Sequence, residues 1–423
     1  MIRGYDMKIV ITDHHCAAER GDSAILEGAI WCLKKFFPNA DFVVMTEYPE
    51  AAEIINGVKA NRQPMTNFKW NKWKMGLAMV YLLIGARLQK HKITVPKFKH
   101  PRIQPYLDAD IVISKGGSFL SDYYAPDVLG RFWGLYFAEV LGKPVIIYAQ
   151  SIGPFEKPFY RWIARYVLNK ADLITLRDKE SKGILDSIGV TRPPIYVTSD
   201  SAFAMPLTEC KPMQMMRYEK IELNNKDQLK VSISVRQWGH YKTADGHKKY
   251  IKIIAALADW LIIEKNAKVI FASTCTGFAG YHNDDRVIAH EVINHMKHYE
   301  EKNPVILYGE YTPQELLAFY RTMDLHVGTR MHSNILAMLA KTPVVAIQYE
   351  FKTLGLLNFF DLENYLIDIN QINLEILIKK VSEALTHNEQ IKAKINEKLP
   401  HIKEKSEQNA ELVFNLIKTK LGT

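Results

Sequence analysis

The stretch LHVGTRMHSNILAMLAKTPVVAIQYEFKT, residues 325–353, decides the fold of the chain. Its first apolar residues predict a short buried strand that ends at Gly328, and the apolar spacing from Ile335 onward predicts a helix. The run VVAIQ predicts the next strand, so the stretch is a βαβ unit of the kind that builds parallel sheets. Arg330 and His332 therefore lie at the N-terminus of the helix, where the first amides and the helix dipole favour an anion.

Short strands and helices alternate in the same way along the rest of the chain. A polar, Met-rich and weakly periodic segment at 207–230 divides the series in two, and 423 residues are too many for one ordinary core. We therefore expect an α/β protein with two doubly wound Rossmann-like domains, at 1–206 and 226–423. Strands are expected at 8–12, 41–46, 110–114, 145–150, 173–176 and 195–198, and at 231–235, 268–273, 305–308, 325–327 and 344–348.

Helices are expected between these strands, among them 23–37, 250–265 and 312–323, and a charged helical region at 374–420 ends the chain. The helix at 312–323 begins with TPQE, which is a capping box with proline at the first helical position.

Basic side chains follow three strands of the second domain, at the sheet edge where doubly wound folds bind ligands. Arg236 follows VSISV, Arg330 follows the strand of the opening stretch, and Lys352 follows VVAIQ. A guanidinium binds phosphate or carboxylate through a bidentate fork, and His332 exchanges a proton near neutral pH. With Met331, which lies between Arg330 and His332, these residues form the expected anion site. The alternative for Arg236 is a solvated charge at the end of a strand, and the alternative for His332 is a helix cap.

Polar loops also follow the strands of the first domain, and they are the expected contacts for a second ligand. A glycine pair such as Gly116 and Gly117 is equally common in turns that have only a structural role. Asp178 in LRDKES is either a helix cap or a ligand contact. The expected contacts are Asp22 in DHHCAAERGDSAIL, Gly116, Gly117 and Ser118 in SKGGSFLSDYY, and Gln150 and Ser151 in YAQSIGPF.

Neither a metal ion nor a bound cofactor is expected. His14, His15 and Cys16 are adjacent in one loop and cannot readily converge on a single ion, and none of the four cysteines forms a CxxC pair. Asp284 and Asp285 either cap a helix or bind a cation or a sugar hydroxyl, and the sequence leaves both interpretations open.

Eight motifs in chain order resemble those of the polysaccharide pyruvyl transferase family: RGDSAIL, GGSFLSD, SIGPF, LRDKES, ISVR, STCTG with DDR, GTRMHS and YEFK. Within the family, STCTG with DDR and GTRMHS are most similar to the colanic acid biosynthesis branch. The resemblance implies a GT-B-like fold with two domains facing a cleft. It implies transfer of pyruvate from phosphoenolpyruvate onto two hydroxyls of a sugar, as a cyclic ketal, with Arg236, Arg330 and His332 contacting the donor.

The chemistry of this reaction agrees with the residue types. Phosphoenolpyruvate carries a phosphate and a carboxylate, so its site needs several cations, and Arg236, Arg330 and Lys352 supply them. Ketal formation needs a proton on the methylene carbon and a sugar hydroxyl that attacks the neighbouring carbon. We assign the proton transfer to His332 and the orientation of the hydroxyl to Asp22, as hypotheses. The expected acceptor is a sugar of an exopolysaccharide or a lipid-linked oligosaccharide, with the first domain on the acceptor side.

Two other functions are compatible with the same sequence. A GT-B glycosyltransferase would bind the diphosphate of a nucleotide-sugar at the basic helix N-terminus, although Arg236, Arg330 and His332 suit a small carboxylate-bearing donor better. The second alternative is a non-catalytic carbohydrate-binding scaffold. The full set of polar loop residues argues against it, because a protein without activity need not keep them. Nucleic acid is not an expected partner, because no basic stripe with interleaved aromatics follows a known module.

The net charge of +9 favours anionic partners, and much of the excess lies in a basic insertion at about 60–105. Trp70, Trp73 and several lysines flank the apolar run at 75–86, which falls short of the ~20 residues that span a bilayer. Peripheral contact with a membrane is one hypothesis for 67–102, and a buried helix beside a solvated basic loop is the other. We expect a cytoplasmic protein, with any such contact at the inner face of the cytoplasmic membrane.

Overall fold

The computed structural model describes most of the chain and divides it into two compact units. The first unit comprises Met1–Ala17, Ala24–Pro206 and Lys403–Thr423, and the second comprises Ala18–Ser23 and Leu207–Ile402. The residues described are 7–65, 72–90, 101–207, 219, 221, 227–239, 241–297, 304–349 and 352–422, without the side chains of 72–76 and 89–90.

The first unit is built on a parallel sheet with the order β3-β2-β1-β4-β6-β7-β8, in which β5 also pairs with β6. The strands are β1 (Lys8–His14), β2 (Asp41–Thr46), β3 (Lys59–Arg62), β4 (Ile111–Ser114), β5 (Gly117–Leu120), β6 (Val145–Ile152), β7 (Leu173–Leu176) and β8 (Ile195–Val197). The helices are α1 (Arg20–Phe36), α2 (Pro49–Asn56), α3 (Lys72–Lys90), α4 (Gln104–Asp108), α5 (Val128–Val140), α6 (Pro158–Leu168) and α7 (Lys179–Ile188).

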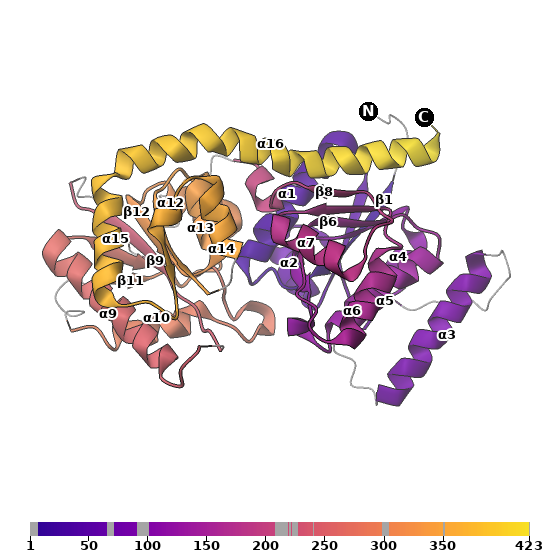
Figure 1. Cartoon of the computed structure of the whole chain (residues 1–423), viewed down its shortest axis with the longest axis horizontal. Coiled ribbons are helices and arrows are strands. Elements are labelled where there is room, and N and C mark those ends of the chain that lie inside the picture. The colour runs from indigo at the N-terminus through magenta and orange to yellow at the C-terminus, as the bar shows by residue number, and fades with distance from the viewer. Residues whose placement is uncertain are drawn as a thin grey trace. The chain divides into compact units, whose positions relative to one another are not determined.

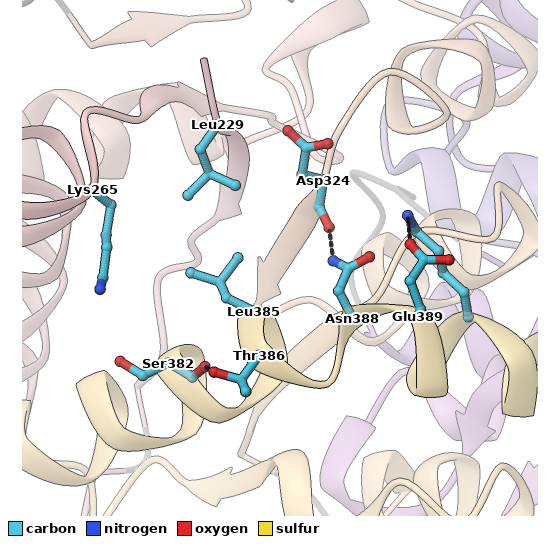
Figure 2. A pocket seen from close by; sticks show the side chains of 9 residues that line it. Leu229, Lys265, Asp324, Ser382, Leu385, Thr386, Asn388 and Glu389 are labelled. Carbon is cyan, nitrogen blue, oxygen red and sulfur yellow. Dashed lines mark hydrogen bonds and ion pairs between the residues drawn. The ribbon is translucent and has the colours of Figure 1, made fainter. Parts of the chain in front are cut away.

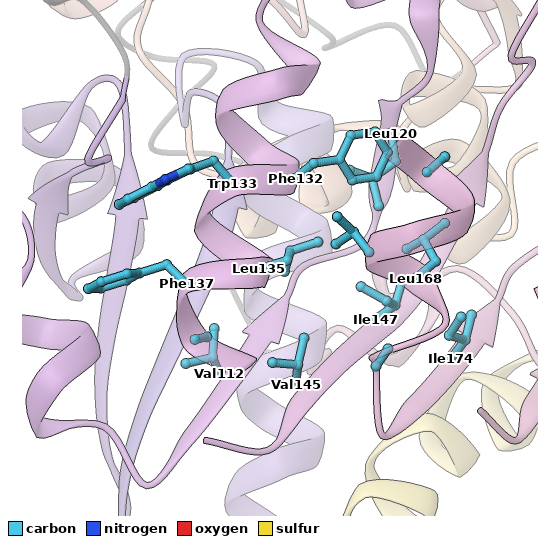
Figure 3. Close-up of a cluster of buried hydrophobic side chains, with 14 of the residues drawn as sticks. Val112, Leu120, Phe132, Trp133, Leu135, Phe137, Val145, Ile147, Leu168 and Ile174 are labelled. Carbon is cyan, nitrogen blue, oxygen red and sulfur yellow. The ribbon is translucent and has the colours of Figure 1, made fainter. Parts of the chain in front are cut away.

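Alternate residues of these strands point to two separate apolar cores, as a sheet buried on both faces requires. On one face Val112, Val145 and Ile147 pack against α5 and α6, where the rings of Trp133 and Phe137 stack with centroids 4.9 Å apart (Figure 3). On the other face Ile9, Ile11, Ile111, Ile113 and Ile146 pack with residues of α1 and of α16 (Asn388–Leu421).

The second unit contains a parallel sheet with the order β11-β10-β9-β12-β13-β14. Helix α9 packs beside α10 and α15, whereas α12 packs on α13, so two helix layers cover the sheet (Figure 1). The strands are β9 (Lys230–Ser234), β10 (Lys268–Phe271), β11 (Val305–Ile306), β12 (Leu325–Gly328), β13 (Val344–Gln348) and β14 (Leu366–Asp368). The helices are α9 (Gly246–Lys265), α10 (Asp285–Ile293), α12 (Pro313–Tyr320), α13 (Met331–Leu339), α14 (Lys352–Phe359), α15 (Leu374–Thr386) and the first part of α16.

The predicted fold class is confirmed: both sheets are parallel and doubly wound, with the strand order of Rossmann-like domains. Every strand expected from the sequence is present, with ends that differ by at most two residues. The capping box at Thr312 is confirmed, since its side chain accepts from the Glu315 amide and the Glu315 carboxylate accepts from the Thr312 amide. The charged helical region at the end of the chain is also confirmed, as α15 and α16.

Three strands were missed by the sequence analysis. The edge strand β3 reads KANR and has no buried residue, so it lacks the apolar pattern by which strands are recognised. Strand β5 begins in the glycine pair that was expected to be a loop, and β14 has only three residues. A large part of the expected connection at 207–230 lies outside the described residues. The same holds for a large part of the basic insertion at 67–102.

Two segments are grouped differently from the predicted domain boundaries. Lys403–Thr423 is part of the first unit, because Ala410, Val413 and Ile417 of α16 enter the core formed with α1. Ala18–Ser23 is part of the second unit, although it follows β1 in the chain. None of the helices that the structure describes has the length and apolar character to cross a bilayer.

Asn409 secures the end of α16 to the first unit. Its fully buried amide accepts a hydrogen bond from Thr198 Oγ1 at 2.7 Å and donates to the Ser199 carbonyl at 3.1 Å. We predict that Asn409→Ala lowers the free energy of unfolding by about 1–3 kcal/mol, because it removes the side-chain donor of the Ser199 carbonyl and one of the two acceptors of Thr198 Oγ1.

Urea denaturation of the whole protein measures this change. Gln408→Ala, on the exposed side of the same helix turn, is the matched control and should change stability by no more than about 0.5 kcal/mol. Equal unfolding midpoints for the two variants would contradict the role given to Asn409.

Candidate functional site

The predicted anion site lies at the point where the strand order of the second sheet reverses. Strands β9 and β12 are neighbours there, and the chain leaves them in opposite directions along the sheet. Doubly wound sheets bind ligands in the crevice at the carboxyl ends of these two strands. Arg236 follows β9 and Arg330 follows β12, so the topology brings together the two arginines that the sequence singled out.

Arg330 occupies the N-cap position of α13, and its guanidinium is buried against two carboxylates. Its Nη2 lies 2.7 Å from Asp285 Oδ1 and its Nε lies 3.1 Å from Asp285 Oδ2, which is a bidentate pair. Its Nη1 is 3.7 Å from Glu19 Oε1. Burial raises the pKa of the Asp285 carboxyl, and the charges of Arg330 and Arg236 oppose that rise. The pair therefore fixes the direction of the guanidinium at the helix start.

A neutral hydrogen-bonded layer supports the turn between β12 and α13. The His326 ring lies 2.8 Å from Ser232 Oγ and 3.0 Å from Ser333 Oγ, and Ser333 Oγ donates to the Arg330 carbonyl at 2.7 Å. Burial lowers the pKa of His326 to about 3, so this imidazole is neutral at physiological pH. The layer holds the motif in place without adding a charge beneath it.

Glycine is required at position 328 because the side chains of Asn334 and His326 pack directly against its Cα. A Cβ on Gly328 would lie 1.9 Å from Asn334 Oδ1, a distance no side chain tolerates. The Asn334 amide donates to the Gly328 carbonyl at 3.2 Å, and Thr329 Oγ1 lies 2.8 Å from the Tyr250 hydroxyl. Gly328, Thr329 and Asn334 therefore stabilise the turn that leads into the N-terminus of α13.

The segment Ala18–Ser23 completes this part of the second unit. The Arg20 amide donates to the Thr274 carbonyl at 2.7 Å, the Thr276 amide donates to the Ala18 carbonyl at 3.1 Å, and Glu19 forms an antiparallel bridge with Cys275. The family motifs RGDSAIL and STCTG are therefore paired through their backbones.

His332 lies against this segment at Gly21. A Cβ on Gly21 would come within 2.4 Å of His332 Cγ and Nδ1, so only glycine permits the backbone to approach the imidazole so closely. His332 is half-buried in the first turn of α13, and Asp22, whose side chain is buried, follows Gly21 in the first turn of α1. The two residues that the sequence assigned to acid–base chemistry thus belong to the same unit and to adjoining segments.

Arg20 and Glu310 are structural members of the site that the sequence analysis missed. The buried Arg20 guanidinium donates to the Tyr311 carbonyl and lies 2.5 Å from Glu310 Oε2. The other carboxylate oxygen of Glu310 lies 2.9 Å from Arg286 Nη1. Arg20 stood in the first family motif, but only the fold reveals that its partner is nearly three hundred positions away in the chain.

Arg236 adds a positive charge that aromatic rings hold in place. Its guanidinium lies 3.9 Å from the centroid of the Tyr349 ring and 5.1 Å from that of Trp238. Tyr349 belongs to YEFK, so the motifs ISVR and YEFK meet here. Lys352 is the half-buried first residue of α14, and Met331 is the half-buried first residue of α13.

The acidic pair at 284–285 has two separate structural roles. Asp284 caps α10 by accepting from the Arg286 amide at 2.9 Å, and it also pairs with the Arg286 guanidinium, which lowers the pKa of its carboxyl. Asp285 is the partner of Arg330. In the described part of the chain, no group of three or more histidine, cysteine, aspartate or glutamate side chains is placed to hold a metal ion.

The polar residues predicted in the first unit make internal contacts. Gly117 pairs with Gln150 between β5 and β6, while Gly116 precedes that strand and Ser118 is half-buried within it. The buried Gln150 amide donates to Ser114 Oγ at 2.6 Å and to the Lys115 carbonyl at 2.8 Å. Ser151 accepts from Arg177 Nε at 2.7 Å and donates to Asp178. Asp178 caps α7, which was one of the two roles predicted for it.

A cluster of buried charges at the reversal point of the first sheet was not predicted. Asp13 follows the pairing of β1 with β4, accepts from Ser114 Oγ at 2.6 Å, and lies 3.4 Å from Arg131 Nη1. Its neighbour His14 is fully buried, and burial together with the charges of Lys115, His15 and Arg131 puts its pKa well below the usual value. Arg131 comes from α5 and has no sequence signal of its own.

A cavity of about 510 Å³ lies at the opposite end of the second sheet (Figure 2). Leu229 and Asp324 line it and immediately precede β9 and β12, so it faces the amino ends of the strands. Asn388 closes part of it by donating to the Asp324 carbonyl at 2.8 Å. Since ligands of doubly wound sheets bind at the carboxyl ends, this cavity is separate from the candidate site.

The buried Arg330–Asp285 pair gives a test of the site's architecture. We predict that Asp285→Asn destabilises the protein by about 3–5 kcal/mol, because it leaves the Arg330 charge buried without its bidentate partner. Chemical denaturation measures the loss, and the double variant Asp285→Asn with Arg330→Met should recover part of it. Additive losses from the two single variants would show that the pair does not stabilise the fold.

Comparison with known proteins agrees with the motifs. The family model described as polysaccharide pyruvyl transferase matches residues 20–350. A relative from Erwinia amylovora, the amylovoran biosynthesis protein AmsJ, is 27% identical over 408 residues, which cover 92% of this chain and 94% of the relative.

Solved structures of carbohydrate enzymes share the fold at low sequence identity. A glycosyltransferase from Rickettsia africae matches with a TM-score of 0.59 and 11% identity, over 98% of this chain and 100% of that chain. The UDP-GlcNAc 2-epimerase from Neisseria meningitidis matches with a TM-score of 0.59 and 10% identity, over the same shares. These likenesses show that the fold is GT-B-like. With more than three quarters of its length matched by the family model, the chain belongs to the polysaccharide pyruvyl transferase family.

Proposed function

We propose that this protein transfers pyruvate from phosphoenolpyruvate to a sugar of an exopolysaccharide, or of its lipid-linked repeat unit, as a cyclic ketal. The observation that carries the proposal is the set of cationic groups around the N-terminus of α13 at the strand-order reversal of the second sheet. The relative from Erwinia amylovora, named for amylovoran biosynthesis, supports an exopolysaccharide acceptor. The colanic acid repeat unit is the first acceptor to test, because the motifs are most similar to that branch.

The donor has two anionic groups, and the site has separate features that suit each of them. The first amides of a helix have no acceptor within the helix, so the start of α13 provides donors together with the positive end of the dipole. Arg236 packs on the Tyr349 ring, and among the described residues no carboxylate forms an ion pair with it, so we assign its charge to the donor. Arg330 is partly neutralised by Asp285 and contributes direction more than net charge. Lys352 is the proposed additional cation.

The proposed reaction begins with transfer of a proton to the methylene carbon of phosphoenolpyruvate. The neighbouring carbon becomes oxocarbenium-like, a sugar hydroxyl adds to it and loses its proton, and inorganic phosphate leaves. The second hydroxyl then adds to the same carbon, also losing its proton, and closes the ring. His332 is the proposed proton donor, and Asp22 orients the attacking hydroxyl. Acceptor contacts are proposed at Gly116, Gly117, Ser118, Gln150 and Ser151.

A nucleotide-sugar glycosyltransferase is the second candidate, favoured by the GT-B-like fold. The Neisseria meningitidis structure is described as bound to UDP-GlcNAc. Incubation of the purified protein with lipid-linked oligosaccharides and either phosphoenolpyruvate or UDP-sugars separates the two functions. We expect release of inorganic phosphate matched by an acceptor mass gain of one pyruvate less water. Sugar transfer from a UDP-sugar without reaction of phosphoenolpyruvate would overturn the proposal.

His332→Ala is predicted to lower kcat by about 10²–10⁴-fold, because general acid–base groups typically contribute that much. Phosphate release from phosphoenolpyruvate with acceptor present measures the rate, after thermal unfolding has shown that the variant is folded. His295→Ala, an exposed histidine just after α10, is the control and should retain normal turnover. Near-normal turnover of His332→Ala would remove this residue from the proton-transfer role.

Gly21→Ala tests whether the close approach to His332 matters for turnover. Alanine ordinarily stabilises a helix relative to glycine. At position 21, however, its Cβ would lie 2.4 Å from His332 Cγ and would displace the imidazole ring. We predict a loss of activity of about 10²-fold, the size expected when a catalytic group moves by roughly 1 Å. Gly183→Ala in α7, where an added Cβ has no atom within 4 Å, is the matched control. Equal activities in the two variants would show that Gly21 does not position His332.

A further inference from the structure

Helix α3 of the first unit is apolar on two opposite faces. Leu82 and Ala86 are buried in the core that α5 and α6 share, and Met79 and Leu83 pack against it. On the other side Leu77, Val80 and Ile84 are 70%, 55% and 55% exposed. These exposed positions follow the i, i+3, i+7 spacing of a single helical face. A solvated helix carries charged or polar residues on its outer face, so the outer face of α3 is suited to a surface other than water.

The charge of the sequence segment that contains α3 indicates what that surface is. Residues 54–107 contain eleven lysines and arginines and no aspartate or glutamate. The whole chain carries +9, so the chain without this segment would carry −2. The entire positive excess of the protein is therefore concentrated in the stretch that contains α3. An apolar helix face within a strongly basic stretch of sequence is the combination that binds anionic lipid headgroups.

Aromatic side chains lie on the same side of the first unit. Helix α5 packs between α3 and α6, and all three cover one face of the sheet (Figure 1). On α6, Phe159 and Trp162 are exposed, and Trp162 stacks on Tyr166 with ring centroids 5.9 Å apart. The Tyr166 hydroxyl lies 3.3 Å from the Tyr136 hydroxyl of α5. Arg87 of α3 is close enough to Tyr136 for the two side chains to interact electrostatically. Tryptophan and tyrosine beside basic residues are typical of the headgroup region of a bilayer.

We propose that the outer face of α3, defined by Leu77, Val80 and Ile84, is a docking surface for an anionic lipid bilayer. The helix lies in the plane of the interface with its apolar side chains among the acyl chains, and the net positive charge of residues 54–107 attracts the anionic headgroups. The docking surface is independent of the transfer chemistry, since it involves none of the residues of the candidate site. Its consequence for the proposed function is that a lipid-linked acceptor is met at the membrane.

Sedimentation with vesicles of phosphatidylcholine, with and without phosphatidylglycerol, tests the surface on the whole protein. We expect binding only when phosphatidylglycerol is present, and weaker binding in about 1 M salt, where the Debye length falls to about 3 Å. The double variant Leu77→Ser with Ile84→Ser should bind at least about tenfold more weakly, since two exposed apolar anchors are lost. Its thermal unfolding and its turnover of a water-soluble acceptor should equal those of the wild type.

The matched control is Val287→Ser with Ile263→Ser, two apolar residues of α10 and α9 that are 64% and 41% exposed and lie outside the basic segment. This variant should bind vesicles as the wild type does. Analytical ultracentrifugation tests the other occupant, a second copy of the chain. Binding that ignores phosphatidylglycerol, equal loss in both double variants, or a dimer that the α3 variant dissociates while vesicle binding persists would each overturn the proposal.

Discussion

The buried ion pair between Arg330 and Asp285 is the interaction on which the candidate site depends. It joins the start of α13 to the start of α10, and Arg330 also approaches Glu19. A charge buried in this way is unfavourable unless its partner and geometry are retained, so the pair constrains three separate segments of the second unit at once. The helix N-terminus that we propose as the anion site is thereby built on rigid elements, and Arg236, which packs on the Tyr349 ring, is the proposed less neutralised cation.

A second constraint is steric. Gly21 allows the backbone of Ala18–Ser23 to lie against the His332 ring, and Arg20 holds that segment through Glu310 and the Tyr311 carbonyl. Motifs from the two ends of the family pattern therefore meet through backbone pairing, ion pairs and one glycine. This arrangement explains why RGDS, STCTG, DDR and GTRMHS occur together in one chain: each supplies a contact that another requires.

The strands followed from the sequence because apolar runs and their spacing report burial directly, and the prediction of an anion site rests on the same pattern. Arg236 and Arg330 were found because parallel strands bring their carboxyl ends to one edge. The partners of these residues were not found, since Asp285 and Glu310 become neighbours of Arg330 and Arg20 only through long-range packing. Strand β3 was missed because KANR has no apolar alternation, and the charges of Asp13 and Arg131 were missed because nothing in α5 marks Arg131 as facing β1.

We propose that the N-terminus of α13 and the segment beside it bind a small donor with a phosphate and a carboxylate. Hydrogen–deuterium exchange of the whole protein, with and without phosphoenolpyruvate, tests it most directly. We predict that phosphoenolpyruvate slows exchange in peptides covering 18–23 and 328–334, and that UDP-sugars do not. Slowed exchange there with a UDP-sugar, and none with phosphoenolpyruvate, would contradict it.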